Sequence, residues 1–319
     1  MNILVTGGAG FIGSNLVSSL LNNSKVTKLR VLDNFSTGFR ENLEPFINHS
    51  KFELMEGDIR DFHTCIRACE GVELISHQAA LGSVPRSIAD PMTTHDVNIT
   101  GTLNIFTAAK DLGVKRIVYA ASSSTYGDHP DLPKVEDKIG RPLSPYAVTK
   151  FVNELYAKVY GDLYNMQFIG LRYFNIFGPA QNPQGPYAAV IPLFIKRLLA
   201  NEAPVINGDG SHSRDFTFVG NAVEANQLAL FTDNVDAVNQ VYNIACGEQT
   251  SLLQLFNLLA SSIGSNLRPV FGPDRTGDVK HSLADIAKAK SLLGYTGAVS
   301  MENGLRSTVL WYKSNPHRL

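Results

Sequence analysis

The stretch TGGAGFIGS, residues 6–14, decides the fold of this chain. It follows the apolar run NILV, which predicts a buried strand, and it precedes residues 11–21, whose apolar side chains recur at helical spacing. Gly7 permits a tight turn, Gly10 leaves room for backbone N–H groups to approach a phosphate, and Gly13 allows close packing of the helix. The N-terminus of that helix suits a pyrophosphate, so we predict a dinucleotide-binding turn.

Asp33 ends the next apolar run, residues 28–33, which is the second predicted strand. A carboxylate about 20 residues after the glycine turn accepts hydrogen bonds from the adenosine ribose and repels a 2′-phosphate. This pattern favours NAD over NADP. The alternative is a glycine-rich structural turn with Asp33 as a solvated residue at a strand end.

Predicted strands alternate with predicted helices through the first half of the chain, which indicates an α/β fold. We predict a Rossmann-type doubly wound parallel sheet with helices on both faces, and a smaller α/β C-terminal substrate-binding domain. The predicted domains are residues 1–172 for NAD, with return segments at about 216–245, and residues 173–319 for substrate, interleaved with the first. The remaining expected strands are 52–55, 72–76, 116–120, 166–171, 204–210 and 240–244, and the remaining expected helices are 62–69, 90–112, 145–162, 190–199, 219–231, 251–263, 285–293 and 301–312.

Composition excludes several classes of function. The 319 residues carry a net charge of −1, which gives no electrostatic reason to expect nucleic acid or a membrane surface as a partner. The cysteines Cys65, Cys69 and Cys246 fit no disulfide or zinc framework, so we expect no metal and a reducing cytoplasm. We see no signal peptide and no apolar run that could span a bilayer. The loop 128–142, rich in Pro, Gly and charge, is expected to be exposed.

Tyr146 and Lys150 stand four residues apart on one predicted helix and so share a face. An ordinary phenol, with a pKa near 10, is a poor base at neutral pH. A neighbouring ammonium and a positive nicotinamide ring would lower the pKa of the phenol and make it a base for a sugar hydroxyl. The alternative reading of the pair is an ordinary helix surface.

These motifs together resemble those of the extended short-chain dehydrogenase/reductases. The resemblance is carried by TGGAGFIG, Asp33, the segment 122–127 (SSSTYG), YAVTK at 146–150 and LRYFNIFGP at 171–179, and it covers essentially the whole chain. Within that family the sequence is most similar to the NAD-dependent UDP-hexose 4-epimerases, particularly those that act on N-acetylated sugars. The resemblance implies an isomerase, with bound NAD as cofactor, a UDP-sugar as substrate and a homodimer built on helices 90–112 and 145–162.

The resemblance implies a catalytic triad of Ser122, Tyr146 and Lys150. Ser122 would hydrogen-bond the sugar 4-hydroxyl, Tyr146 would remove its proton, and Lys150 would hold the nicotinamide ribose. Hydride would pass from C4 to NAD⁺, and the resulting 4-ketose would turn over before hydride returned to its other face. The related 4,6-dehydratases need an Asp–Glu pair after the serine, and Ser123 and Ser124 stand there instead, so elimination is excluded.

The expected cofactor contacts follow the ends of the first strands. Small residues after the fourth strand leave room for the cofactor, and Asp58 is a candidate for the adenine, whereas Asp61 is as well explained as a helix N-cap. The full predicted set is Gly7, Gly10, Phe11, Ile12, Gly13, Asp33, Asn34, Ser36, Thr37, Gly38, Asp58, Ile59, Gln78, Ala79, Ala80, Asn98, Tyr146, Lys150 and Tyr173.

The substrate contacts are expected largely from the second domain. Arg214 and Arg275 match the family's diphosphate arginines, for which the alternative is a surface ion pair, and Asp278 would bind the uridine ribose. Ser282 occupies the place where a bulky residue would restrict the enzyme to plain hexoses, so a small one admits a 2-acetamido group. The full predicted set is Ser83, Ser122, Ser123, Ser124, Tyr146, Asn175, Val190, Asn207, Arg214, Arg275, Asp278 and Ser282.

Three functions are open at this stage. The first is epimerisation of UDP-GlcNAc and UDP-GalNAc, with UDP-glucose and UDP-galactose as a weaker pair, for polysaccharide biosynthesis. The second is a UDP-hexuronate (glucuronate/galacturonate) 4-epimerase, in which Arg86 or Ser83 would meet the carboxylate. The third is a non-catalytic NAD-binding regulatory module, which the complete triad argues against.

Overall fold

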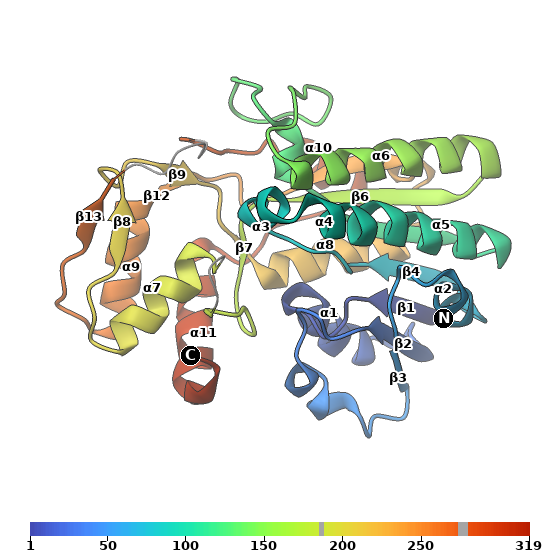
Figure 1. Cartoon of the computed structure of the whole chain (residues 1–319), viewed down its shortest axis with the longest axis horizontal. Helices are drawn as coiled ribbons and strands as arrows, with labels where there is room; N and C mark the ends of the chain where they lie inside the picture. Colours follow the sequence, from blue (N-terminus) through green and yellow to red (C-terminus); the bar gives the residue numbers. More distant parts are fainter. Residues whose placement is uncertain (185–187, 274–279) are drawn as a thin grey trace.

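The computed structural model describes residues 1–184, 188–273 and 280–319, and its centre is a seven-stranded sheet in the order β11-β6-β5-β4-β1-β2-β3 (Figure 1). Every neighbouring pair in this sheet is parallel. The strands are β1 (Asn2–Thr6), β2 (Lys28–Asp33), β3 (Phe52–Glu56), β4 (Leu74–His77), β5 (Arg116–Ser122), β6 (Gln167–Tyr173) and β11 (Gln240–Ile244).

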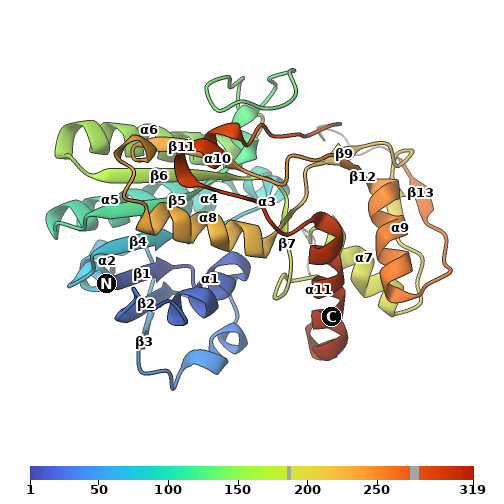
Figure 2. The same cartoon turned by 180° about the vertical axis from the view of Figure 1, so that it is seen from behind.

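Helices cover both faces of the sheet, as Figures 1 and 2 show from opposite sides. One face carries α2 (Phe62–Cys69), α5 (Gly101–Asp111) and α6 (Pro145–Tyr164), and the other carries α1 (Phe11–Leu21), α8 (Val219–Phe231) and α10 (Ala287–Leu293). Each face buries its own apolar core, which is why the strands read as nearly continuous apolar runs. The predicted doubly wound α/β fold is confirmed.

The sheet is not completed by consecutive residues. After β6 the chain leaves the sheet, returns as α8, and only then adds β11 beside β6, with Gln240 opposite Ile169. Residues Ala289, Leu293 and Tyr295 pack into the same core from still further along the chain. The predicted domain limits stay a prediction, and the observed interleaving extends to α10.

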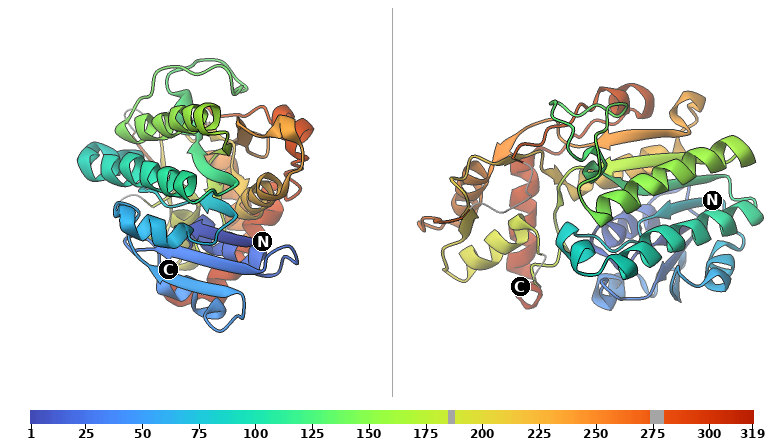
Figure 3. Two further views of the ribbon diagram at one scale, coloured as in Figure 1. Left: turned by 90° about the vertical axis from the view of Figure 1, so that its right-hand side faces the viewer. Right: turned by 45° about the horizontal axis from the view of Figure 1, so that its top comes forward.

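The second unit of the chain is smaller and lies beyond the carboxyl ends of the strands (Figures 1 and 3). Its core joins α7 (Val190–Leu199), α9 (Leu252–Ile263) and α11 (Met301–Ser314) through Phe194, Phe256 and Tyr312. Three two-stranded sheets accompany them: β7 (Ile176–Phe177) with β10 (Thr217–Phe218), β9 (Ser213–Arg214) with β12 (Thr250–Ser251), and β8 (Val205–Asn207) with β13 (Val270–Gly272).

Several segments differ from the sequence-based expectation, among them the short strands β7, β9, β10, β12 and β13, which were not expected. The helix expected over 90–112 is α4 (Pro91–His95), a π-helical turn η3 (Asp96–Thr100) and α5 in succession. A further helix, α3 (Val84–Ala89), lies where no helix was expected. The loop 128–142 is not wholly exposed, because Lys134 and Glu136 are buried against the segment 283–285 and against Asn243. None of the helices in the described part of the chain is long and apolar enough to cross a membrane.

Candidate active site

The glycine turn between β1 and α1 has the geometry that its sequence predicts. Gly7 has φ +70°, a conformation that favours glycine, and a Cβ on Gly13 would stand 2.1 Å from the Gly7 carbonyl oxygen. Gly13 is therefore required by the turn itself, which refines the expectation that it serves packing of the helix on the strand. Helix α1 begins after Gly10 without a side-chain cap, so its first N–H groups face the place where a pyrophosphate would lie.

Asp33 lies at the end of β2 beside this turn. Its carboxylate accepts N–H bonds from Ala9 and Phe35, both at 2.8 Å. Burial raises the pKa of Asp33, and the two backbone donors offset part of that rise. A carboxylate oxygen accepts more than one hydrogen bond, so Asp33 can still receive ribose hydroxyls.

A cavity follows the glycine turn along the carboxyl ends of β1, β2, β3 and β4. A Cβ on Gly7 would meet Ala79 N at 2.7 Å and a Cβ on Gly38 would meet Ala9 C at 2.8 Å, so the backbone packing of the cavity wall requires both glycines. The uncapped start of α1 and the Asp33 carboxylate at the cavity fit the pyrophosphate and the ribose of a dinucleotide. Twelve of the predicted cofactor residues line the cavity: Gly7, Gly10, Asp33, Asn34, Ser36, Thr37, Gly38, Asp58, Ile59, Gln78, Ala79 and Ala80.

Asp58 is already strongly bound within the protein. Its carboxylate accepts hydrogen bonds from Arg60, including Nη2 at 2.7 Å, and from Asn34 Nδ2 at 2.8 Å. The hydrogen bond from Arg60 lowers the pKa of Asp58 to about 2, so the group is ionised at neutral pH. Asp61 takes the place expected of a helix cap and accepts N–H bonds from His63 and Thr64 at the start of α2.

Asn98 lies behind the cavity wall, where it is fully buried. It accepts from Leu81 N at 2.7 Å and donates to Leu81 O at 3.1 Å and to Thr149 Oγ1 at 3.1 Å. These bonds hold the strand end after Ala80 and join it to α6. The structure thus gives Asn98 a supporting position, and its direct contact with the cofactor stays a prediction.

Tyr173 closes the other side of this cavity wall. Its hydroxyl donates to Gln78 Oε1 at 3.1 Å and accepts from Asn226 Nδ2 at 2.7 Å. Burial raises the pKa of Tyr173 to about 12, so it stays a neutral phenol. Tyr173 thereby fixes the orientation of Gln78, which lines the cavity.

Ser122, at the end of β5, meets Tyr146, in the first turn of α6. Ser122 Oγ accepts two hydrogen bonds from Ser124, from N at 3.2 Å and from Oγ at 2.9 Å. The Ser122 hydroxyl also makes a hydrogen bond with the Tyr146 hydroxyl, which lowers the pKa of that phenol. The serine cluster therefore has an internal order, with Ser124 orienting Ser122 and Ser122 facing Tyr146.

Lys150 lies one turn further along α6 and is buried. Its Nζ atom donates to Ala120 O at 2.8 Å and lies 5.9 Å from the centre of the Tyr146 ring. Burial lowers the pKa of Lys150 to about 8. Burial also raises the pKa of Tyr146, and the hydrogen bond with Ser122 offsets only part of that rise. The lowering expected from the ammonium together with a bound nicotinamide stays a prediction.

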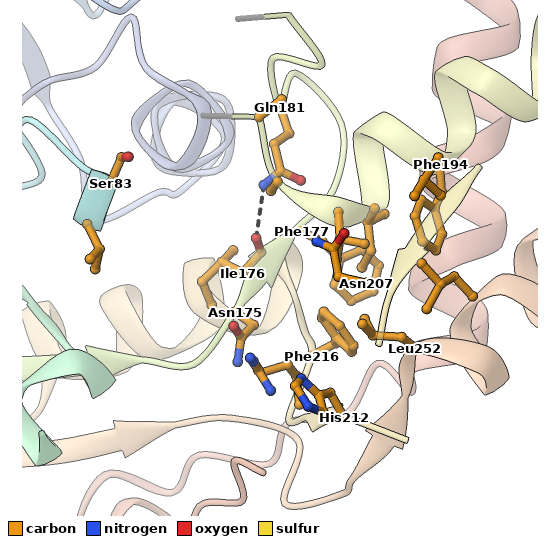
Figure 4. A pocket seen from close by; sticks show the side chains of 18 of the residues that line it. Ser83, Asn175, Ile176, Phe177, Gln181, Phe194, Asn207, His212, Phe216 and Leu252 are labelled. Carbon is orange, nitrogen blue, oxygen red and sulfur yellow. Dashed lines mark hydrogen bonds between the residues drawn. The ribbon is translucent and has the colours of Figure 1, made fainter. Parts of the chain in front are cut away.

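Two adjoining cavities lie between the segment after β5 and the second unit. The first, of about 610 Å³, borders Ser123, Ser124, Phe174 and Ser282, and the second, of about 430 Å³, borders residues of α7 and β8. Both include Asn175 and Arg214 in their walls, so they form one cleft. In Figure 4, Ser83 lies across the second cavity from Asn207, Phe194 and Leu252, and the Gln181 amide donates to Ile176 O.

Several predicted substrate residues come together in this cleft. Ser83, Asn175, Val190, Asn207 and Arg214 line the second cavity. Ser83 has φ +94°, an uncommon conformation for a residue with a side chain, and its hydroxyl caps α3 through Arg86 N. Arg214 Nη1 is held by Ser213 O and Lys280 O, at 3.0 and 3.1 Å. Arg275 and Asp278 lie outside the described residues.

The cleft also has walls that sequence reasoning missed. Lys134, His281 and Leu143 border the first cavity, while Phe216 and His212 border the second. Lys134 reaches the wall because its N–H donates to Leu283 O at 2.8 Å, a pairing between distant segments that no local pattern reveals. His281 could have been predicted as a wall residue, because it directly precedes the predicted substrate residue Ser282.

Asp215 ties the walls together behind Arg214. Its carboxylate accepts N–H bonds from Cys246 at 3.0 Å, Gly247 at 3.0 Å and Ala284 at 3.3 Å. Burial raises the pKa of Asp215 to about 6 despite these bonds. One carboxylate thus joins the segment of β9, the end of β11 and the segment that carries Ser282.

The fold and the cavity at the glycine turn together define a dinucleotide-dependent enzyme of the doubly wound α/β class. More particularly, the chain belongs to the NAD dependent epimerase/dehydratase family, whose model matches residues 3–245. This confirms the extended short-chain dehydrogenase/reductase assignment and makes NAD the cofactor.

Three similar proteins illustrate the range of activities near this chain. The putative UDP-glucose 4-epimerase of Methanocaldococcus jannaschii is 38% identical over 98% of this chain and 99% of its own length. The UDP-N-acetylglucosamine 4-epimerase of Methanobrevibacter ruminantium M1, solved with UDP-N-acetylmuramic acid, is 38% identical, with a TM-score of 0.93 and 98% of each chain covered. The UDP-glucuronic acid 4-epimerase of Bacillus cereus, solved with UDP-glucuronic acid and NAD, is 30% identical, with a TM-score of 0.90 over 99% of this chain and 100% of the other.

Proposed function

We propose that this protein interconverts UDP-N-acetylglucosamine and UDP-N-acetylgalactosamine by epimerisation at C4, with UDP-glucose and UDP-galactose as a weaker pair. The coarser assignment, an NAD-dependent UDP-sugar 4-epimerase, follows from the family and from the activities of the relatives. The finer assignment rests on Ser282, a small side chain in the wall of the cavity that also borders Ser124 and Asn175. A small residue there leaves volume for a 2-acetamido group beside the reacting part of the sugar.

The residues of the triad would divide the work as follows. When bound, NAD⁺ supplies the hydride acceptor, and in its reduced form the donor, for C4 of the sugar. Ser122 would hold the 4-hydroxyl, and Tyr146 would take its proton as hydride leaves and return it afterwards. Lys150 would place positive charge beside the nicotinamide ribose and favour the ionised phenol.

The cofactor would be held by the residues of the glycine turn and by Asp33. Backbone N–H groups at the start of α1 would bind the pyrophosphate, and the Asp33 carboxylate would bind the adenosine ribose. Because hydride is returned in every cycle, the enzyme gains nothing from releasing the cofactor. We therefore expect the purified protein to carry NAD.

A second candidate, epimerisation of a UDP-hexuronate, is favoured by one observation. Lys134 is buried in the wall of the sugar cavity, where it donates a hydrogen bond to His129 O. A buried ammonium near the sugar would suit a carboxylate at C5. Burial lowers the pKa of Lys134, however, so its charge is less secure than that of a surface lysine.

The experiment is a comparison of kcat/KM for UDP-GalNAc, UDP-galactose and UDP-galacturonate, with NAD supplied. We expect the acetylated sugar to be converted fastest, and fastest conversion of the galacturonate would instead establish the second candidate. In Ser282→Tyr we expect conversion of UDP-GalNAc to fall while that of UDP-galactose survives. In Tyr146→Phe we expect turnover to fall by about 10²–10⁴-fold with NAD content unchanged; no conversion of any sugar by the unmodified protein would reject the assignment as an epimerase.

We also propose that the protein is a homodimer. Helix α6 exposes an apolar stripe of Val148, Leu155, Val159 and Leu163, at spacings of seven, four and four, although its other face is buried against the sheet. The neighbouring α4 adds Met92, which is 71% exposed. A stripe of this kind on two adjacent helices suits the same two helices of a second copy.

A further inference from the structure

A buried ion pair lies beneath the catalytic centre, on the same helix as Lys150. Glu154 follows Lys150 by one helical turn, so the two side chains share a face of α6. The Glu154 carboxylate receives Arg172 Nε at 2.9 Å and Arg172 Nη2 at 2.7 Å. The two side chains are only 7% and 4% exposed, so water does little to screen their charges.

The position of this pair is fixed from several sides. Arg172, on β6, donates its third hydrogen bond to Glu136 O at 2.8 Å, and its guanidinium lies 4.8 Å from the centre of the Tyr126 ring. Thr125 Oγ1 donates to Glu154 Oε1 at 3.4 Å. The free-energy cost of desolvating two buried charges often exceeds the gain from their attraction. Stability alone therefore does not explain this ion pair.

Lys150 supplies that reason, because it is a cation in an interior that disfavours charge. The groups that face it are the His77 ring on β4, the Ala120 carbonyl on β5, and Tyr146 and Glu154 on α6. Burial lowers the pKa of His77 to about 3 and raises the pKa of Tyr146, so both are neutral at pH 7. The carboxylate of Glu154 opposes the effect of burial and raises the pKa of Lys150.

The bidentate bond to Arg172 decides how Glu154 acts. Because Arg172 occupies both carboxylate oxygens, Glu154 influences Lys150 through its field rather than by accepting an N–H from it. Lys150 has three N–H donors, and one of them goes to Ala120 O. The other N–H donors of Lys150 can therefore bind a ligand, while the Glu154 carboxylate still stabilises the ammonium charge.

We propose that Glu154 and Arg172 are positioning residues for catalysis: Arg172 holds the Glu154 carboxylate in place on the Lys150 face of α6, and that carboxylate keeps the Lys150 ammonium charged. The consequence for the reaction rests on the role proposed above for Lys150. The effect of Glu154 on the charge of Lys150 does not depend on that catalytic role.

The test is a pH titration of Lys150 followed by NMR of the ¹³C-labelled lysine Cε in the purified, NAD-containing protein, with the signal assigned by its loss in Lys150→Met. In Glu154→Gln, which keeps the shape and removes the charge, we expect the Lys150 midpoint to fall by about one pH unit or more. In Glu154→Asp, which keeps the charge but strains the bond to Arg172, we expect a similar loss of thermal stability with a midpoint near that of the unmodified protein. Asp162→Asn, an exposed carboxylate on the same helix, is the matched control and should leave the midpoint unchanged.

A Glu154→Gln midpoint equal to that of the unmodified protein would overturn the proposal, as would equal shifts in the Gln and Asp variants. If Glu154→Gln does not fold, the double variant Glu154→Gln/Arg172→Met removes both buried charges, a change that proteins often tolerate, and should still lower the midpoint. The alkaline limb of the kcat profile should move by the same amount. A protein that converts no UDP-sugar would still give the titration, so the two proposals fail separately.

Discussion

Ser124 Oγ lies 2.9 Å from Ser122 Oγ, and the backbone N–H of Ser124 also donates to that atom. Ser122 Oγ is thus oriented by its neighbour two residues on, and its hydroxyl is hydrogen-bonded with Tyr146. In the run of serines, Ser122 thus faces Tyr146 and Ser124 orients Ser122. This arrangement makes the order of the three serines testable.

We expect Ser124→Ala to lower kcat by about fivefold, because one hydrogen bond that orients Ser122 is worth about 1 kcal/mol. Ser123→Ala is the matched control, since it removes a hydroxyl from the same cavity wall and leaves both bonds to Ser122 Oγ in place. Initial rates with saturating UDP-GalNAc would measure the effect. Equal losses in the two variants would show that the serines act only by contacting substrate.

Two glycines of the turn should fail in different ways when changed to alanine. At Gly10 a Cβ would stand 3.2 Å from the Gly7 carbonyl oxygen, a contact that small shifts can relieve, so Gly10→Ala should fold but lose NAD. At Gly13 the same atom would be 2.1 Å away, so Gly13→Ala should also lose about 1–3 kcal/mol of stability. Thermal unfolding together with NAD released on denaturation separates the outcomes. Full NAD content in Gly10→Ala would contradict a close approach of the pyrophosphate there.

Asp215 predicts a pH dependence of stability. Burial raises its pKa to about 6 in the folded chain, whereas an unfolded Asp titrates near 4, so the folded state holds the proton more tightly. Its contribution is therefore full below about pH 4 and is lost as pH rises through about 6, an effect of about 2–3 kcal/mol. The melting temperature of the unmodified protein, relative to that of Asp215→Asn, should fall by several degrees between pH 4 and 7. A difference that is constant with pH would show that Asp215 is ionised throughout.

The apolar stripe on α6 predicts the oligomeric state. Leu155 and Val159 are 51% and 47% exposed on the face that we assign to a second copy. Leu155→Glu/Val159→Glu would bury two charges at that contact and should raise the dimer dissociation constant by about 100-fold or more. Light scattering after gel filtration measures the mass. Leu310→Glu on α11, at a residue 64% exposed and far along the chain, should leave the mass unchanged.

Local patterns predicted much of the fold. The bounds of α1, α2, α7, α8, β2 and β11 agree with the sequence, because the apolar pattern of each segment begins and ends close to those residues. The dinucleotide cavity was equally accessible, since its residues follow successive strand ends. Contacts between distant segments could not be predicted in this way. The sequence around Lys134 and Glu136 indicates an exposed loop, and only the contacts with residues 283–285 and with Asn243 bury these two side chains.

The site shows the same division. The i, i+4 spacing of Tyr146 and Lys150 predicted their common face, but the direction of the Tyr146 pKa within the protein did not follow from it. Burial is a property of the whole fold, and it outweighs the one partner of Tyr146 that lowers the pKa. Likewise no local signal pairs Glu154 with Arg172, which meet only because α6 packs against β6.

The late position of β11 in the chain has a consequence for synthesis. While the ribosome is making residues 174 to 239, the emerging sheet ends at β6, with an unsatisfied row of backbone groups along that edge. Only after Ile244 has left the exit tunnel can the edge be covered. Nascent chains that stall before that residue should be prone to aggregation and should depend most on chaperones.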